Sequence, residues 1–171
     1  MRTVFSNNSE VAHVWAQRTH LDGRTSKGNL FFEGGRIYSY GYHYLLGEFI
    51  SNEKNEVAVI INTDYYSSST VKHSSLAWGA TTHYTQFEKQ YTEEKSVISL
   101  LNELGTKLLK ARKPLIYINE ANTVINNHLE YLDFMHGRGF LPKSVLKAYE
   151  PFQLDEEELK ALQDKDKERR K

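Results

Sequence analysis

The residues of this chain that could do chemistry gather around a lysine–histidine pair, Lys72 and His73. The pair lies in a hydroxyl-rich stretch, residues 62–75, which comes directly after the most apolar run, Val57–Ile61. A buried strand that opens into a polar turn and a helix start holds reactive groups on a rigid edge. The side chains that such a site could recruit are His13, Ser39, His43, Ser67, Ser69, Thr70, Lys72 and His73.

These residue types suit proton transfer and phosphate binding. Two imidazoles titrate near neutral pH, so one can act as general base and the other as general acid. A lysine at a helix start can stabilise negative charge, hydroxyls can hold phosphate oxygens, and tyrosine rings can stack on bases. The combination is typical of metal-independent phosphodiester cleavage. The competing interpretation is structural: residues 67–70 cap a helix and His73 is a surface residue.

We assign roles on this basis. The candidate catalytic residues are His13, His43, Lys72 and His73, and the candidate ligand-binding residues are Tyr40, Ser69, Thr70 and Arg24. Arg24 lies in residues 19–29, which have no hydrophobic period and contain two glycines, so we predict a loop there. A basic loop can hold a phosphate, and the alternative is a solvated connection.

Standard site motifs are absent from the sequence. It contains no P-loop, no G-x-G-x-x-G, no H-E-x-x-H and no His-x-His pair. It also contains no cysteine, which excludes disulfides, thiolate catalysis and cysteine zinc sites and fits a reducing compartment. We therefore predict neither a metal site nor a cofactor.

The charges balance, with 22 Lys and Arg against 22 Asp and Glu. The molecule as a whole therefore has no field that would draw it to nucleic acid or to an acidic membrane. This weakens binding of nucleic acid and leaves binding of a small nucleotide open. No run approaches the roughly 18 apolar residues of a membrane span, and the N-terminal residues lack an apolar signal core. We expect an intracellular protein without membrane association.

The first half of the chain is predicted to place the site on strands and two short helices. A strand at residues 3–5 precedes a helix over 9–18, and a hairpin turns at residues 33–36 between runs 30–32 and 37–40. The second run is expected to continue to residue 46. It would carry Tyr38, Tyr40, Tyr42 and Tyr44 on one face and Ser39, Gly41 and His43 on the other. After a turn at residues 51–56, the run Val57–Ile61 is predicted to be a strand buried on both faces, followed by a helix over 71–78 that Gly79 ends.

The second half changes to a helical period. Apolar residues three and four apart predict a helix over 93–112, and a second helix over 114–137 begins at Pro114. A short helix over 144–149 follows. The predicted fold class is α+β, an antiparallel sheet from the N-terminal half packed against helices from the C-terminal half. We predict one domain over residues 1–151 and a charged, helical or frayed tail over 152–171.

Three blocks of the sequence resemble a family of small proteins encoded by bacteriophages. They are residues 9–17, with His-Val-Trp-Ala in a helix, residues 29–44, with Phe-Phe-Glu-Gly and Ile-Tyr-Ser-Tyr-Gly-Tyr-His, and residues 68–73, Ser-Ser-Thr-Val-Lys-His. The resemblance implies a phage origin and a place in the host cytoplasm, and it implies no reaction. It covers roughly residues 5–80 and draws attention to His13, Tyr40, His43, Lys72 and His73, which match its blocks.

Two functions of different classes remain open, and with them whether the protein is an enzyme. The first is a site that binds, and by extension cleaves, a nucleotide or nucleic acid. The second is a non-catalytic accessory protein that binds a host or phage protein. It would use an exposed aromatic patch drawn from Tyr65, Tyr66, Tyr84, Phe87 and Tyr91. The oligomeric state is left open as well.

Overall fold

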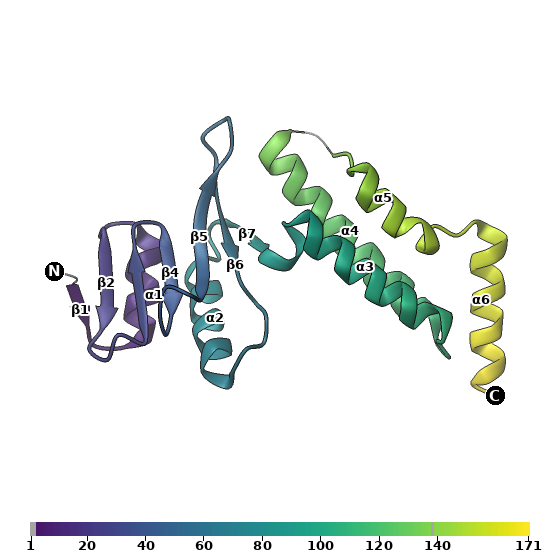
Figure 1. Ribbon diagram of the computed structural model, residues 1–171, viewed down its shortest axis with the longest axis horizontal. Coiled ribbons are helices and arrows are strands. Elements are labelled where there is room, and N and C mark those ends of the chain that lie inside the picture. The colour runs from purple at the N-terminus through teal and green to yellow at the C-terminus, as the bar shows by residue number, and fades with distance from the viewer. Residues whose placement is uncertain (1–2, 138) are drawn as a thin grey trace. The chain divides into compact units, whose positions relative to one another are not determined.

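A computed structural model describes residues 3–137 and 139–171 (Figure 1). The chain divides into two compact units, Met1–Gln90 and Tyr91–Lys171. Each unit has its own hydrophobic core, and each is described by itself below. The sequence-based boundary at residue 151 falls inside the second unit.

The first unit is a seven-stranded sheet with two helices. The strands are β1 (Thr3–Phe5), β2 (Asp22–Thr25), β3 (Leu30–Glu33), β4 (Arg36–Ser39), β5 (Leu45–Ser51), β6 (Val57–Ile61) and β7 (Thr85–Glu88). Their order across the sheet is the order in which they occur in the chain. Helix α1 (Asn8–Gln17) connects β1 to β2, and helix α2 (Ser68–Ala80) connects β6 to β7.

The pairing of the strands brings both helix starts to one edge of the sheet. Strands β1 and β2 are parallel, as are β6 and β7, whereas the four pairings between β2 and β6 are antiparallel. Strands β1 and β6 consequently run in the same direction. Because α1 follows β1 and α2 follows β6, both helices begin at the edge where these strands end. Sites in α/β folds lie at this edge, beyond the carboxyl ends of the strands.

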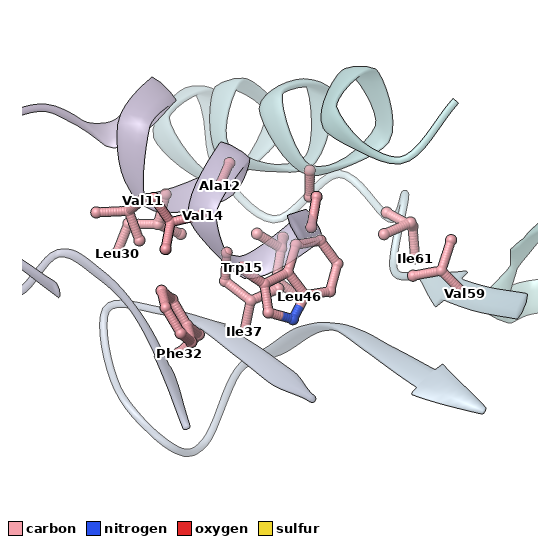
Figure 2. Close-up of a cluster of buried hydrophobic side chains, with 12 residues drawn as sticks. Val11, Ala12, Val14, Trp15, Leu30, Phe32, Ile37, Leu46, Val59 and Ile61 are labelled. Carbon is pink, nitrogen blue, oxygen red and sulfur yellow. The ribbon is translucent and has the colours of Figure 1, made fainter. Parts of the chain in front are cut away.

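Both helices pack on the same face of the sheet (Figure 2). Trp15 of α1 is 1% exposed and inserts among the strand side chains, and its indole Nε1 donates to the Gly35 carbonyl at 3.1 Å. The residues that share this core are Val11, Ala12, Val14, Trp15, Ala16, Leu30, Phe32, Ile37, Leu46, Val59, Ile61 and Ala77. This core fixes α1 and α2 side by side, and their N-terminal turns form the walls of the site.

Residues 19–29 are not a loop throughout, contrary to the sequence-based expectation. Asp22–Thr25 form strand β2, which pairs with β1 on one side and β3 on the other. The glycine that indicated a loop is required by packing. A Cβ atom on Gly23 would lie 2.6 Å from the Phe5 ring and 2.7 Å from the Phe32 ring. Glycine is therefore used here because two aromatic rings approach the backbone closely.

The strand predicted over residues 37–46 is also wrong in its second half. Strand β4 ends at Ser39, and the chain turns through Tyr40 (φ 61°) and Gly41 (φ 145°) before β5 begins at Leu45. The Ser39 N–H donates to the Tyr44 carbonyl and closes this turn. The four tyrosines therefore do not share a face. Tyr38 and Tyr42 pack with Phe31, Tyr40 stacks on His73, and Tyr44 packs on Tyr66.

The second unit is helical. It contains α3 (Glu94–Leu109), α4 (Pro114–His136), α5 (Lys143–Tyr149), the 3-10 helix η2 (Glu150–Phe152) and α6 (Glu156–Arg169), and the 3-10 helix η1 (Lys89–Tyr91) spans the boundary between the two units. Leu101 is fully buried at the centre of its core. The other buried members of that core are Val97, Leu104, Ile118, Ala121, Val124, Ile125, Val145 and Phe152. The helices predicted over 93–112, 114–137 and 144–149 are confirmed, with ends that differ by a few residues.

The α+β class is confirmed, with the sheet in the N-terminal half and the helices α3–α6 in the C-terminal half. In detail the sheet is mixed, because a helix between β1 and β2 and another between β6 and β7 make those two pairings parallel. The face of the sheet that contains Phe32 and Ile61 is covered by α1 and α2. Within residues 3–137 and 139–171, no helix is both long and apolar enough to cross a membrane.

Candidate functional site

A pocket of about 530 Å³ lies where α1 and α2 begin. Its walls come from four places in the chain: the start of α1, the residue before β3, the residue after β4, and the first two turns of α2. At this end of the β3–β4 hairpin, the Tyr40 N–H donates a hydrogen bond to the Asn29 carbonyl at 2.8 Å and so connects the two strands. The lining residues are Asn8, Asn29, Tyr40, Ser69, Val71, Lys72, His73, Ser75 and Leu76. The volume is in the range of small-molecule sites.

His73 is the most constrained side chain of the pocket. Only 4% of its surface is exposed, and both ring nitrogens have partners. Nδ1 lies 2.7 Å from the hydroxyl oxygen of Ser39, which is fully buried, and Nε2 lies 3.3 Å from the amide nitrogen of Asn8. The three residues come from α2, β4 and α1. The imidazole therefore ties the helices to the end of the hairpin.

The environment of His73 keeps its ring neutral. Burial removes water from the imidazole and lowers the pKa of His73 below its ordinary value of 6.5. The Asn8 amide nitrogen can only donate, so Nε2 accepts and the ring proton is on Nδ1, where it is donated to Ser39. A neutral imidazole with its lone pair at the pocket wall is a proton acceptor at neutral pH.

Tyr40 covers His73 in a strained backbone conformation. Its ring stacks on the imidazole with centroids 5.4 Å apart and 28° between the planes. About half of the side chain, 48%, remains exposed. The backbone of Tyr40 is left-handed, with φ 61°, which is rare for a bulky side chain and costs of the order of 1–3 kcal/mol. Strain of this kind is retained where the side chain has to be held in a particular place.

Lys72 supplies the charge of the site. Among the described residues that line the pocket, it alone carries a formal charge at neutral pH, and it is exposed. Ser69, in the first turn of α2, lines the same wall. The pocket is thus weakly positive, with an aromatic ring, two amides and hydroxyls around one ammonium group. A pocket of this composition suits an anionic ligand that has a flat ring.

Four of the eight residues assigned from sequence line this pocket, namely Tyr40, Ser69, Lys72 and His73. The two other histidines do not. His13 is exposed on α1, where its Nε2 lies 3.0 Å from the Gln17 amide nitrogen. His43 is exposed in the β4–β5 turn, next to Gly41, where an added Cβ would lie 2.9 Å from its Nδ1. The structure does not bring three histidines to one site.

Thr70 and Arg24 have structural partners instead. The Thr70 hydroxyl accepts from the Ser67 N–H at 2.9 Å, and the Ser67 hydroxyl accepts from the Thr70 N–H at 3.2 Å. This is a capping box, and it leaves Thr70 1% exposed. The structural interpretation of residues 67–70 as a cap is therefore confirmed, whereas its other part, His73 as a surface residue, is wrong because His73 is buried. Arg24 donates to the carbonyls of Thr25 and Ser26 in the turn after β2.

Asn8, Asn29 and Ser39 are among the residues of the site that had no role assigned from the sequence. Asn8 directly precedes the helix predicted over 9–18, and Asn29 belongs to the loop predicted over 19–29. Ser39 was placed beside His43 rather than His73. The pairing of Leu30 with Ser39 in the hairpin was the available signal, because it puts Asn29 and Tyr40 next to each other at the same end.

The aromatic patch predicted for partner binding does not form as a set. Phe87 is 7% exposed, and Tyr84 packs against the first core with its hydroxyl donating to the Ala16 carbonyl. Tyr65 and Tyr66, by contrast, are 78% and 70% exposed. The exposed members of the predicted patch are therefore the two tyrosines of the β6–α2 connection.

Comparison with known proteins adds no relative. No protein-family model, no curated protein and no solved structure matches this chain. Within the described part of the chain, no three side chains of the metal-binding types gather at one place. The site is therefore interpreted from its own geometry.

Proposed function

We propose that the pocket between α1 and α2 binds a nucleotide, either free or as part of a nucleic acid. The observation that carries the proposal is the convergence of Tyr40, Lys72 and His73, from two distant parts of the chain, on one pocket of about 530 Å³. The exposed part of the Tyr40 ring offers a surface for a base. Lys72 and Ser69 lie at the start of α2, where the helix dipole also favours an anion such as a phosphate.

The geometry favours proton transfer by His73 as a second step. Its neutral ring accepts at Nε2, and Ser39 fixes the orientation of the ring from the buried side. A bound ligand with a hydroxyl at Nε2 would replace the Asn8 amide and give up its proton there. Among the described residues that line the pocket there is no second histidine, so the Lys72 ammonium, the Tyr40 hydroxyl, water or the ligand would have to act as the general acid, and binding is the primary proposal.

The resemblance to bacteriophage proteins adds the setting that we propose, the cytoplasm of an infected host cell. The accessory-protein function remains the alternative. It would rest on Tyr65 and Tyr66, the exposed tyrosines of the β6–α2 connection.

The proposal is tested by titrating nucleoside mono- and diphosphates into the protein by calorimetry. Lys72→Gln should weaken binding about tenfold to a hundredfold, because a hydrogen bond to a charged group contributes about 1.5–3 kcal/mol. Tyr40→Gly should weaken binding and raise thermal stability, because glycine relieves the positive φ while it removes the stacking ring. Lys54→Gln, in the exposed β5–β6 turn, is the matched control for the loss of one charge.

If wild type binds none of these nucleotides, or if Lys72→Gln and Lys54→Gln bind them equally, the pocket is not a nucleotide site. A pull-down comparing wild type with a Tyr65→Ser, Tyr66→Ser variant then tests the accessory-protein function. Turnover would be followed separately with RNA and cyclic nucleotides, where His73→Gln should abolish any cleavage that wild type shows.

A further inference from the structure

The second unit has a basic pocket of about 450 Å³ that shares no lining residue with the pocket of the first unit. It is lined by Arg112, Lys113, Asp166, Arg169 and Arg170, four cations and one carboxylate. The end of α6 meets the α3–α4 turn here, because Arg169 Nη1 donates to the Arg112 carbonyl at 2.8 Å and to the Ala111 carbonyl at 3.3 Å. Residues 107–113 carry four basic and no acidic residues. A chain with no net charge thus concentrates positive charge at one place.

Helix electrostatics explain only half of this cluster. Arg169 and Arg170 lie at the C-terminal end of α6, where cations are stabilised by the negative end of the helix dipole. Arg112 and Lys113 immediately precede α4, where the dipole is positive and cations are unfavourable. The first turn of α4 contains no acidic residue, and Lys113 makes no side-chain cap. An anion bound at this point would offset the excess positive charge.

Asp166 is the second, independent sign of a ligand. Its side chain lines the pocket and is 6% exposed. Oδ2 holds the Arg170 guanidinium at 3.2 Å, whereas Oδ1 has no hydrogen-bond partner among the described residues. A buried carboxylate oxygen without a donor is costly. A ligand that brings an N–H or O–H together with its anionic group would satisfy this carboxylate as well as the cations, once the side chain turns Oδ1 towards the pocket.

We infer that this pocket binds the phosphate of a nucleotide unit, presented by a free nucleotide or by a single-stranded nucleic acid. Guanidinium groups hold phosphate oxygens through paired hydrogen bonds, and the pocket has three of them. Ribose hydroxyls and base amino groups supply the donor that Asp166 lacks. Asp166 acts as a positioning residue, since it holds Arg170 while 67% of the arginine side chain stays exposed.

The inference is tested by fluorescence polarisation with a labelled single-stranded RNA of about 12 nucleotides. Arg112→Gln combined with Lys113→Gln should weaken binding about tenfold or more, the effect of losing charge-assisted hydrogen bonds. It should also reduce the slope of log affinity against log salt by about 1.4, because each lost phosphate contact to a single strand accounts for about 0.7. Lys143→Gln combined with Lys147→Gln removes the same charge from α5 and should change binding by less than about twofold.

Competition with a nucleoside monophosphate and with pyrophosphate distinguishes a free nucleotide from a nucleic acid as the source of the phosphate. The loss caused by Arg112→Gln with Lys113→Gln should be the same in a Lys72→Gln background as in the wild-type chain, which separates this pocket from the pocket of the first unit. Equal effects of the two charge pairs would overturn the inference, and so would tighter competition by a glutamate-rich peptide than by nucleotides. Lys113→Gln alone provides a milder variant if the double variant does not fold, as judged by circular dichroism.

Discussion

Helix α2 of the first unit and helix α4 of the second both begin beside a pocket, and their first turns are built in opposite ways. At α2 the Ser67 and Thr70 side chains satisfy each other's backbone N–H groups, and the nearby His73 has a partner on each nitrogen. At α4 the preceding residues are Arg112 and Lys113, and Lys113 makes no side-chain cap. The start of α2 is therefore capped by side-chain hydrogen bonds, whereas the start of α4 has two neighbouring positive charges and no side-chain cap.

The difference predicts two ways of recognising a ligand. In the first pocket both nitrogens of His73 are already paired, so the pocket discriminates by shape and by the few groups that can exchange partners, here Asn8 and Tyr40. A pocket with unpaired charge binds through electrostatic attraction and is sensitive to salt. Affinity in the first unit should therefore depend on which base is offered, whereas affinity in the second should depend on ionic strength.

The largest effect is expected from breaking one core while sparing the other. Leu101→Ala removes a fully buried side chain from the second unit and should lower its free energy of unfolding by about 2–5 kcal/mol. Both tryptophans, Trp15 and Trp78, belong to the first unit. The midpoint of denaturant unfolding should thus fall when it is followed by far-ultraviolet circular dichroism, and it should stay unchanged when it is followed by tryptophan fluorescence.

Ala12→Gly, in the first core, is the converse variant and should move the fluorescence transition. Coincident transitions for both probes in wild type and in Leu101→Ala would instead mean that the chain unfolds as one cooperative domain, which is what the sequence-based boundary at residue 151 predicts.

A smaller effect is expected from His73→Gln, with a dependence on pH. At neutral pH the variant should lose about 1–3 kcal/mol, because the buried Ser39 hydroxyl loses its partner. The pKa of His73 is lowered in the folded state, so the unfolded chain binds more protons below pH 6.5. The neutral ring therefore contributes to the free energy of unfolding above pH 6.5, and this contribution is lost as the pH falls from 6.5 through the lower pKa of the folded state.

Chemical denaturation at a series of pH values measures how the free energy of unfolding of wild type and of His73→Gln depends on pH. Wild type should lose stability below pH 6.5 more steeply than His73→Gln. His13→Gln, on the exposed side of α1, is the matched control and should keep the wild-type slope. If the free energy of unfolding falls with pH in the same way for wild type and His73→Gln, the ring is not held neutral by burial.

The smallest effect is expected from removing the N-terminal cap of α2 and adding one to α4. Ser67→Ala should cost about 0.5–2 kcal/mol, because it removes the cap of α2. Lys113→Ser should have the opposite sign and gain about 0.3–1 kcal/mol at low salt, because it adds a cap and removes an unfavourable charge. Thermal unfolding at low and high salt checks both, and only the Lys113→Ser effect should shrink with salt. A loss of stability in Lys113→Ser would contradict the surplus of charge at α4.

The sequence predicts most elements here because their signals are local. Helical spacing of apolar residues located α1, α3 and α4, and the Gly34-Gly35 turn located the β3–β4 hairpin. The two failures have a common cause. Gly23 lacks a side chain because the rings of Phe5 and Phe32 approach its backbone, and the left-handed Tyr40 stacks its ring on the distant His73. Periodicity and turn propensity carry no information about such contacts.

The candidate site was predicted in part for the same reason. Lys72, His73 and Ser69 belong to one helix and follow from its position after β6. Ser39 and Asn8 are 34 and 65 positions before His73 in the sequence. They join the site only because the sheet and α1 bring them within hydrogen-bonding distance of His73. His13 and His43 were included on residue type alone, and their positions in the fold place them elsewhere.

The order of the strands also bears on how the first unit is assembled during synthesis. Each strand pairs with the strand made immediately before it, so the sheet can grow from β1 towards β7 without any strand being inserted between two others. Topologies of this kind have short sequence separations between contacts and fold quickly. The pocket is an exception within that sequence of events. It requires α2, which comes after the sixth strand, and His73 closes onto Ser39 only when the helix docks. A ribosome-bound chain that ends before α2 would have most of the sheet and no binding site.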